Sequence, residues 1–184
     1  ACSGTCPKVP NAGVLDGGNL LGVQRTYKCN DGYALFGTPT TTCQVNAEWS
    51  KPAFECRDCG ECPRMENALV NNGLSLLGTS RSYNCLPGYA MVGENNIVCN
   101  PDATWSQPKF ICKACGKPPA EPNAELLEDG TWLDTMLIGT VRSYKCKPGY
   151  VLEGRSEIQC VDGAKWSEPK FRCYGEYGCS GTNL

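Results

Sequence analysis

The chain has 184 residues, including 15 cysteines, 21 glycines and 13 prolines but no histidine, and its formal net charge is −2. This cysteine content predicts disulfide cross-links in an oxidising compartment, so we expect a secreted, extracellular protein. The composition argues against nucleic-acid binding, membrane insertion, a cofactor and histidine-based catalysis, and so predicts that the chain is not an enzyme.

One stretch of sequence occurs three times. In chain order the copies read RTYKCNDGY from Arg25, RSYNCLPGY from Arg81 and RSYKCKPGY from Arg142. In each copy the next cysteine follows 14 residues after the central one, and another follows 13 residues later. An Asn-Ala pair precedes the central cysteine by 18, 18 and 23 residues, so the third copy contains a five-residue insertion. The chain is therefore a threefold repeat.

Short β-rich stretches alternate with turn sequences within each copy. They include RTYKC, TTTCQV, RSYNC, RSYKC, EIQC and KFRC, and the turns include NDG, LPG and KPG. This pattern predicts small all-β modules. A module of this size buries too little apolar surface to fold comfortably without cross-links. A tryptophan lies seven residues before the last cysteine of every copy, and we expect these side chains to be core: Trp49, Trp105 and Trp166.

The repeat predicts three modules and a tail. Their expected bounds are 1–58, 59–114 and 115–173, followed by a tail at 174–184 that contains an extra cysteine. Only Arg57-Asp58 and Lys113-Ala114 separate consecutive modules. Two-residue linkers leave little room for bending, so we expect a semi-rigid linear rod.

The repeated motif resembles that of the complement control protein module, also called sushi or short consensus repeat. The resemblance rests on four cysteines per copy, Tyr-x-Cys-x-x-Gly-Tyr and the tryptophan before the last cysteine, and it covers nearly the whole chain. It implies a compact, elongated β-module in which the first cysteine pairs with the third and the second with the fourth. Spacing alone leaves the pairing open. The pairs that the resemblance implies are Cys2–Cys43, Cys29–Cys56, Cys59–Cys99, Cys85–Cys112, Cys115–Cys160 and Cys146–Cys173.

Three cysteines exceed this framework. Cys59 lies eight residues before the asparagine of its Asn-Ala pair, as the framework cysteine of the third copy does, whereas Cys62 stands where that copy has Pro118. Cys6 is the equivalent of Cys62 in the first copy, and the third surplus cysteine is Cys179. The segment CSGTNL around Cys179 is similar to the ACSGTC that opens the chain. It could begin another module, form a terminal segment or match by coincidence.

The surplus cysteines are candidates for disulfides between chains. Equivalent points on stacked modules would lie roughly 25 Å apart, whereas the Cα atoms of a disulfide lie within about 7 Å. Cys6 and Cys62 are therefore not expected to pair within a chain, and an exposed surplus cysteine beside a module junction, such as Cys62, is best placed to join chains. A metal site at Cys56, Cys59 and Cys62 is disfavoured because the framework uses two of them and no histidine is present.

The insertion in the third copy is a candidate contact loop. Its sequence, ELLEDGTWLDTM at residues 125–136, adds a tryptophan and an acidic cluster. The tryptophan could mark an interface or pack onto its own module, and both interpretations stay open. The candidate contact residues are Glu125, Glu128, Asp129, Trp132 and Asp134.

These observations favour an extracellular, non-enzymatic protein that binds other proteins. The surplus cysteines favour copies joined by disulfides into an oligomer or fibre with a structural or matrix role. One alternative is immune recognition or complement-type regulation, which the resemblance implies. Another is the non-catalytic arm of a larger mosaic protein.

Overall fold

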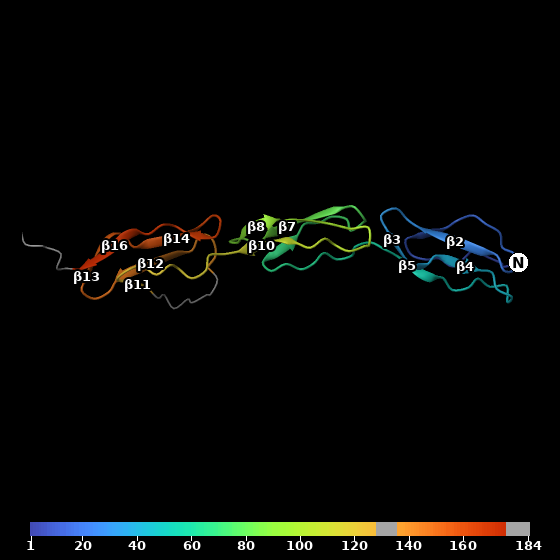
Figure 1. Cartoon of the computed structure of the whole chain (residues 1–184), viewed down its shortest axis with the longest axis horizontal. Coiled ribbons are helices and arrows are strands. Elements are labelled where there is room, and N and C mark those ends of the chain that lie inside the picture. Colours follow the sequence, from blue (N-terminus) through green and yellow to red (C-terminus); the bar gives the residue numbers. More distant parts are fainter. Residues whose placement is uncertain (128–135, 176–184) are drawn as a thin grey trace, which may run out of the picture. The chain divides into compact units, whose positions relative to one another are not determined.

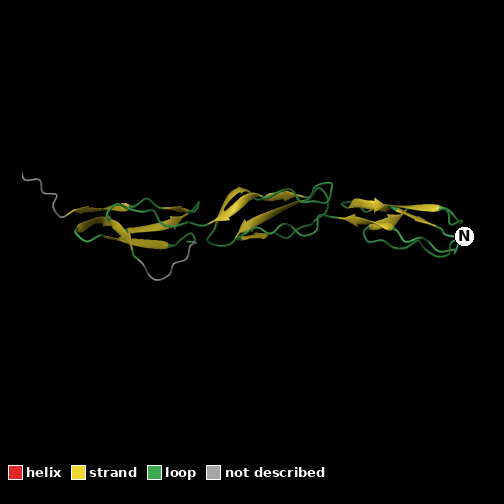
Figure 2. Ribbon diagram, turned by 60° about the horizontal axis from the view of Figure 1, so that its bottom comes forward, coloured by secondary structure: helices red, strands yellow, loops and turns green. Residues whose placement is uncertain are grey.

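The computed structural model describes residues 1–127 and 136–175, and these consist of strands joined by turns (Figure 1). The described residues contain no helix (Figure 2), and hence none that could cross a membrane. The prediction of all-β modules is confirmed.

The first repeat contains strands β1 to β5, the second β6 to β10 and the third β11 to β16. The strands of the first repeat are β1 (Ala12–Val14), β2 (Gln24–Cys29), β3 (Ala34–Thr38), β4 (Thr40–Thr42) and β5 (Ala53–Arg57). Those of the second are β6 (Ala68–Val70), β7 (Ser80–Cys85), β8 (Ala90–Glu94), β9 (Asn96–Val98) and β10 (Lys109–Lys113). Those of the third are β11 (Ala124–Leu126), β12 (Val141–Cys146), β13 (Tyr150–Arg155), β14 (Glu157–Val161), β15 (Lys165–Trp166) and β16 (Lys170–Gly175).

Each repeat pairs its strands in the same two groups. The first repeat has a three-stranded sheet in the order β1-β2-β4 and a two-stranded sheet of β3 and β5. The second has β6-β7-β9 and β8 with β10, and the third has β11-β12-β14-β15 and β13 with β16. One disulfide in each repeat joins its two sheets, and these disulfides connect β2 to β5, β7 to β10 and β12 to β16.

Alternation along the strands decides which side chains enter the small interiors. In β5, Phe54 and Cys56 are buried while their neighbours face outward, as expected from the two-residue period of a strand. In the first repeat Tyr27 packs against Phe54, with ring centroids 5.0 Å apart, and in the third Tyr144 packs against Phe171 at 5.2 Å. A disulfide cysteine and a pair of rings thus form much of each of these cores.

The Asn-Ala pairs of the sequence mark a recurrent backbone turn. Asn11, Asn67 and Asn123 have φ angles of 60°, 57° and 58°, in the left-handed region that asparagine tolerates better than most residues. Each asparagine is followed by the alanine that begins the first strand of its repeat. The pair is therefore explained by local backbone geometry.

Contacts between Cα atoms divide the chain into two compact units that do not follow the repeats. The first consists of Ala1–Arg64, Val70–Tyr83 and Asn95–Lys109. The second consists of Met65–Leu69, Asn84–Glu94 and the described residues from Phe110 onward. The expected module bounds and the linear rod remain predictions.

Candidate functional site

Six disulfides cross-link the three repeats within the described residues. Their Cα–Cα distances lie between 5.5 and 5.9 Å, within the range that a disulfide requires. The bonded pairs are Cys2–Cys43, Cys29–Cys56, Cys59–Cys99, Cys85–Cys112, Cys115–Cys160 and Cys146–Cys173. The cysteines that the sequence assigns to the framework are thus those used for cross-linking.

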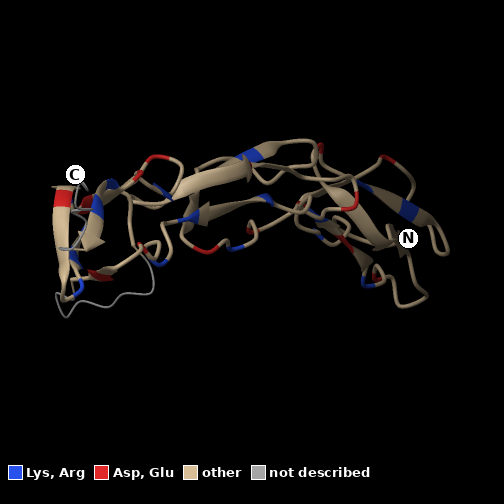
Figure 3. Cartoon of the chain, turned by 60° about the vertical axis from the view of Figure 1, so that its left-hand side comes forward, with Lys and Arg blue, Asp and Glu red and all other residues tan. Residues whose placement is uncertain are grey.

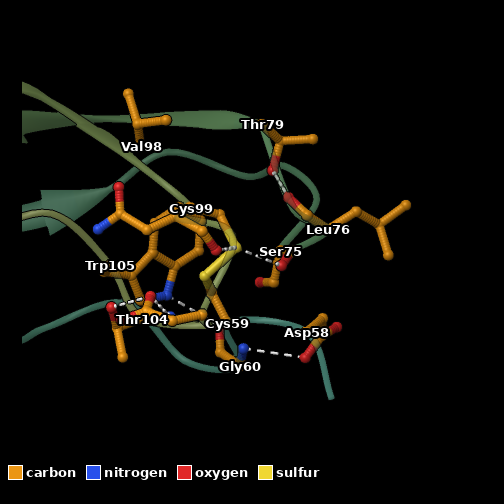
Figure 4. Close-up of a disulfide and its surroundings, with 12 residues drawn as sticks. Asp58, Cys59, Gly60, Ser75, Leu76, Thr79, Val98, Cys99, Thr104 and Trp105 are labelled. Carbon is orange, nitrogen blue, oxygen red and sulfur yellow. Dashed lines mark hydrogen bonds between the residues drawn. A yellow bond between two sulfur atoms is a disulfide. The ribbon is translucent and has the colours of Figure 1, made fainter. Parts of the chain in front are cut away.

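The repeated tryptophans lie beside one disulfide of each repeat and are half-buried. In Figure 4 the ring of Trp105 lies next to the Cys59–Cys99 disulfide, and its Nε1 donates to the carbonyl oxygen of Gly60 at 3.3 Å. Trp166 donates in the same way to Gly116 at 3.0 Å. Trp49 is buried at Nε1 without a partner. Each of the three tryptophans pairs across strands with a disulfide cysteine, namely Cys43, Cys99 and Cys160.

The surplus cysteines Cys6 and Cys62 occupy matching positions, and neither forms a disulfide with another described residue. Each precedes a proline whose carbonyl oxygen accepts a hydrogen bond from a core tyrosine hydroxyl. Tyr27 donates to Pro7 and Tyr83 donates to Pro63, both at 2.6 Å, and in the third repeat Tyr144 donates to Pro119 at 2.6 Å. Cys6 and Cys62 therefore stand where the third repeat has Pro118, and the hydrogen bond to the following proline is the same in all three repeats. The sequence pattern did not predict this hydrogen bond.

The surplus thiol of Cys6 is buried. Its side chain is only 8% exposed and belongs to the core cluster of Tyr27, Phe54 and Cys56. Cys62 is half-buried. Cys6 lies against the aromatic core because a small apolar thiol packs well there. Cys179 lies outside the described residues.

The tyrosine hydroxyls of these sites resist ionisation. Burial raises the pKa of Tyr27, Tyr83 and Tyr144, and the neighbouring Cys6, Cys62 and Glu121 raise the pKa of each in turn. The protonated hydroxyl is also the form that donates to the proline carbonyl.

A prediction follows for alkaline pH. Because the pKa of these tyrosines is higher in the folded chain than in the unfolded chain, stability should fall as the pH rises above about 10, where the unfolded chain loses protons first. Absorbance at 295 nm should show a late-ionising group of tyrosines, and Tyr27→Phe should reduce the late amplitude. Ionisation of all the tyrosines in a single early step while the repeats remain folded would contradict this assignment.

The candidate contact loop is only partly described. Glu125 lies on β11 and forms an ion pair with Lys145, with 3.5 Å between Oε2 and Nζ. Both side chains lie at the edge of a surface hollow of about 700 Å³ in the third repeat, together with Lys117, Glu121 and Tyr144. Glu128, Asp129, Trp132 and Asp134 lie outside the described residues, so their role as a contact loop stays a prediction.

Residues of both charge signs are spread along the described chain, as the colouring of Figure 3 shows. Within the described residues, no group of three or more cysteine or acidic side chains has the geometry to hold a metal ion. In the Cys56-x-x-Cys59-x-x-Cys62 stretch, Cys56 and Cys59 are bonded to Cys29 and Cys99. That stretch therefore contributes one disulfide cysteine to each of two repeats, and Cys62 is its remaining cysteine.

Comparison with known proteins gives matches along most of the chain. The family model described as Sushi repeat (SCR repeat) matches residues 5–56, 59–112 and 115–173. The rat C4b-binding protein beta chain is 32% identical over 182 residues, which cover 94% of this chain and 67% of that protein. Human complement receptor type 2 is 29% identical over 187 residues, which cover 92% of this chain and 18% of the receptor.

A third relative is much longer than this chain. The rat sushi, von Willebrand factor type A, EGF and pentraxin domain-containing protein 1 is 30% identical over 172 residues, which cover 89% of this chain but 5% of the relative. The chain therefore spans only a small part of this relative's length. With three successive matches to the family model, which together cover most of the chain, the chain belongs to the sushi repeat family.

Proposed function

We propose that the chain is a non-catalytic, extracellular array of three sushi modules that binds other proteins through its outer surface. This proposal rests on how each module fills its small interior. Two disulfides and an aromatic cluster fill each small core, and large apolar side chains such as Leu74 and Ile111 are left 65% and 57% exposed. A binding surface must therefore lie outside, and scattered apolar side chains can serve as its anchors.

The names of the relatives support protein binding as the activity of such repeats. They include a C4b-binding protein and a complement receptor. The module bounds that we propose remain 1–58, 59–114 and 115–173. With two-residue linkers, neighbouring modules would present their surfaces at a restricted spacing.

Protein capture tests this proposal. The disulfide-bonded chain, immobilised and exposed to extracellular fluid, should retain proteins that an excess of the soluble chain competes away. The reduced and alkylated chain is the matched control because it has the same composition without the fold. Equal retention by the two preparations, or none that the soluble chain competes for, would sink the proposal. C4b, tested alone by surface plasmon resonance, distinguishes complement-type recognition from binding of other proteins.

A covalent assembly, with a structural or matrix role, is the second candidate, and the free half-buried thiol of Cys62 favours it. Two Cys62 thiols, or the thiols of Cys62 and Cys179, would form a disulfide by exchange with glutathione disulfide. The exchange releases two molecules of reduced glutathione. Burial raises the pKa of Cys62, so little thiolate is present at neutral pH and the reaction should be slow. Cys6 would require local opening of its core.

Intact mass under denaturing, non-reducing conditions tests this second candidate. Incubation with glutathione disulfide should give linked chains that a reductant separates. Cys62→Ser should lower their yield at least tenfold, whereas Cys6→Ser should leave the yield within about twofold, because the Cys6 thiol is shielded. Undiminished linkage in the Cys62→Ser chain would exclude Cys62 as the joining residue.

A further inference from the structure

Consecutive repeats meet through the same pair of contacts at both of their junctions. In the first compact unit, the backbone N–H of Leu77 donates to the carbonyl oxygen of Gly32 at 2.9 Å. In the second compact unit, the N–H of Ile138 donates to the carbonyl oxygen of Gly88, also at 2.9 Å. The acceptor in each case is the glycine of an x-Gly-Tyr turn, and the donor is an apolar residue of the following repeat.

The residue before each donor packs directly on that glycine. A Cβ atom added to Gly32 would lie 2.8 Å from the Cβ atom of Leu76, and one added to Gly88 would lie 2.8 Å from that of Leu137. Both glycines have a φ of 88°, which also disfavours a side chain. Figure 4 shows the Leu76 side chain directed away from the Cys59–Cys99 disulfide of its own repeat. The junction thus consists of an apolar pair placed on a glycine turn.

The first repeat has the same apolar pair without a glycine turn against it. Leu20 and Leu21 lie nine and eight residues before Cys29, as Leu76 and Leu77 lie before Cys85. Leu20 is 66% exposed and Leu21 is 54% exposed, whereas Leu76 and Leu77 are half-buried.

The third repeat has the same glycine turn without an apolar pair against it. Gly149 has a φ of 84°, and a Cβ atom placed there would meet no atom of the described residues within 4 Å. Among the described residues, the Gly149 carbonyl oxygen accepts no hydrogen bond, in contrast to those of Gly32 and Gly88.

Both unpaired surfaces already have the backbone conformation of the paired ones. Next to Leu21, Gly22 donates to Cys43 at 2.8 Å, and Gly78 donates to Cys99 at the same distance in the second repeat. At the turn, Tyr150 donates to Lys147 at 3.1 Å, as Tyr89 donates to Leu86. Docking would therefore need little rearrangement of either surface.

We propose that the Leu20–Leu21 surface of one copy docks on the Gly149 turn of a second copy. The turn around Gly149 shares its Pro-Gly-Tyr sequence with the turn around Gly88, which already receives Leu137 and Ile138. The contact joins two different surfaces and so gives head-to-tail chains rather than closed pairs. It names a partner for the proposed binding array and involves no cysteine, so it does not depend on covalent assembly.

The association is weak in dilute solution. Within the chain, a short linker holds the two surfaces at an effective concentration on the order of millimolar, which two separate copies lack. A contact of two leucines and one hydrogen bond has to offset the loss of free rotation and translation. The dissociation constant is therefore on the order of 10⁻⁴ to 10⁻³ M.

Sedimentation equilibrium of the full chain tests the docking, with Cys62→Ser and Cys179→Ser to prevent covalent linkage. The average mass should rise with concentration between 0.02 and 2 mM, which are on the order of the expected dissociation constant. Leu20→Asp with Leu21→Asp should lower the association constant at least tenfold. Val45→Asp is the matched control, because Val45 is 95% exposed and lies outside the junction.

The turn is tested separately. Gly149→Asn keeps a residue that tolerates a positive φ but adds a Cβ atom where the leucine would pack, so it should also lower the association constant tenfold. Gly163→Asn is its control, with a φ of 83° and open space around it. The Leu20/Leu21 variant and the Gly149 variant, each monomeric alone, should form a one-to-one dimer when mixed.

The outcomes separate clearly. A mass that stays monomeric up to 2 mM, or association that survives both the leucine and the glycine variants, would overturn the docking. Either result leaves competed capture of other proteins intact, so the docking and the binding-array proposal fail in different experiments. Amide protection of β2 and β12 measures folding of each variant independently of association.

Discussion

The double variant Cys2→Ala with Cys43→Ala should unfold the first repeat. The bond between these cysteines spans 41 residues, and closing a loop of that length in the unfolded chain contributes about 4 kcal/mol of stability. A repeat this small has about that much stability in total, so β1 to β5 should lose their protection against hydrogen exchange.

A local measurement suits this chain because three repeats need not unfold together. Exchange followed by mass spectrometry should show full exposure of the first repeat while β12 and β14 of the third remain protected. Cys6→Ala is the control, since Cys6 is buried but unbonded and its replacement should cost about 1 kcal/mol. Equal loss of protection in the two variants would remove the distinction between framework and surplus cysteines.

Gly154→Ala should destabilise the third repeat by about 3 kcal/mol or more. Gly154 pairs with Phe171 across β13 and β16, and an added Cβ atom would overlap the carbonyl oxygen of Lys170 and lie 3.0 Å from the Cα atom of Phe171. Its φ of 96° adds strain for any side chain. The two strands cannot separate freely, because the Cys146–Cys173 disulfide holds β16 to β12.

The matched control for this variant is Gly163→Ala. Gly163 has a φ of 83° but open space around it, so the change should cost only the backbone strain of about 1 to 2 kcal/mol. Hydrogen exchange of β13 and β16 gives the difference between the variants, which isolates the steric overlap. Equal protection in the two variants would show that the strands separate to admit a methyl group.

The fold class was predictable because its signals are local and repeated. Strand alternation, Gly-Tyr turns and the spacing of the cysteines recur three times, and each repetition reduces the chance of coincidence. The disulfide pairing came from a resemblance, since spacing alone permits several connectivities. The positive φ of Asn11, Asn67 and Asn123 explains a marker that the sequence showed without its reason.

By itself the sequence determined that this is a histidine-free, cysteine-stapled array of three β-repeats, and that Cys6 and Cys62 are equivalent and surplus. Only the tertiary structure decided that Cys6 is buried and that Leu76 packs on Gly32 while Leu20 stays exposed. The physical reason is that exposure and docking depend on groups distant along the chain. The cross-links of a repeat join cysteines of that repeat alone, whereas the neighbouring repeat decides which of its surfaces are covered.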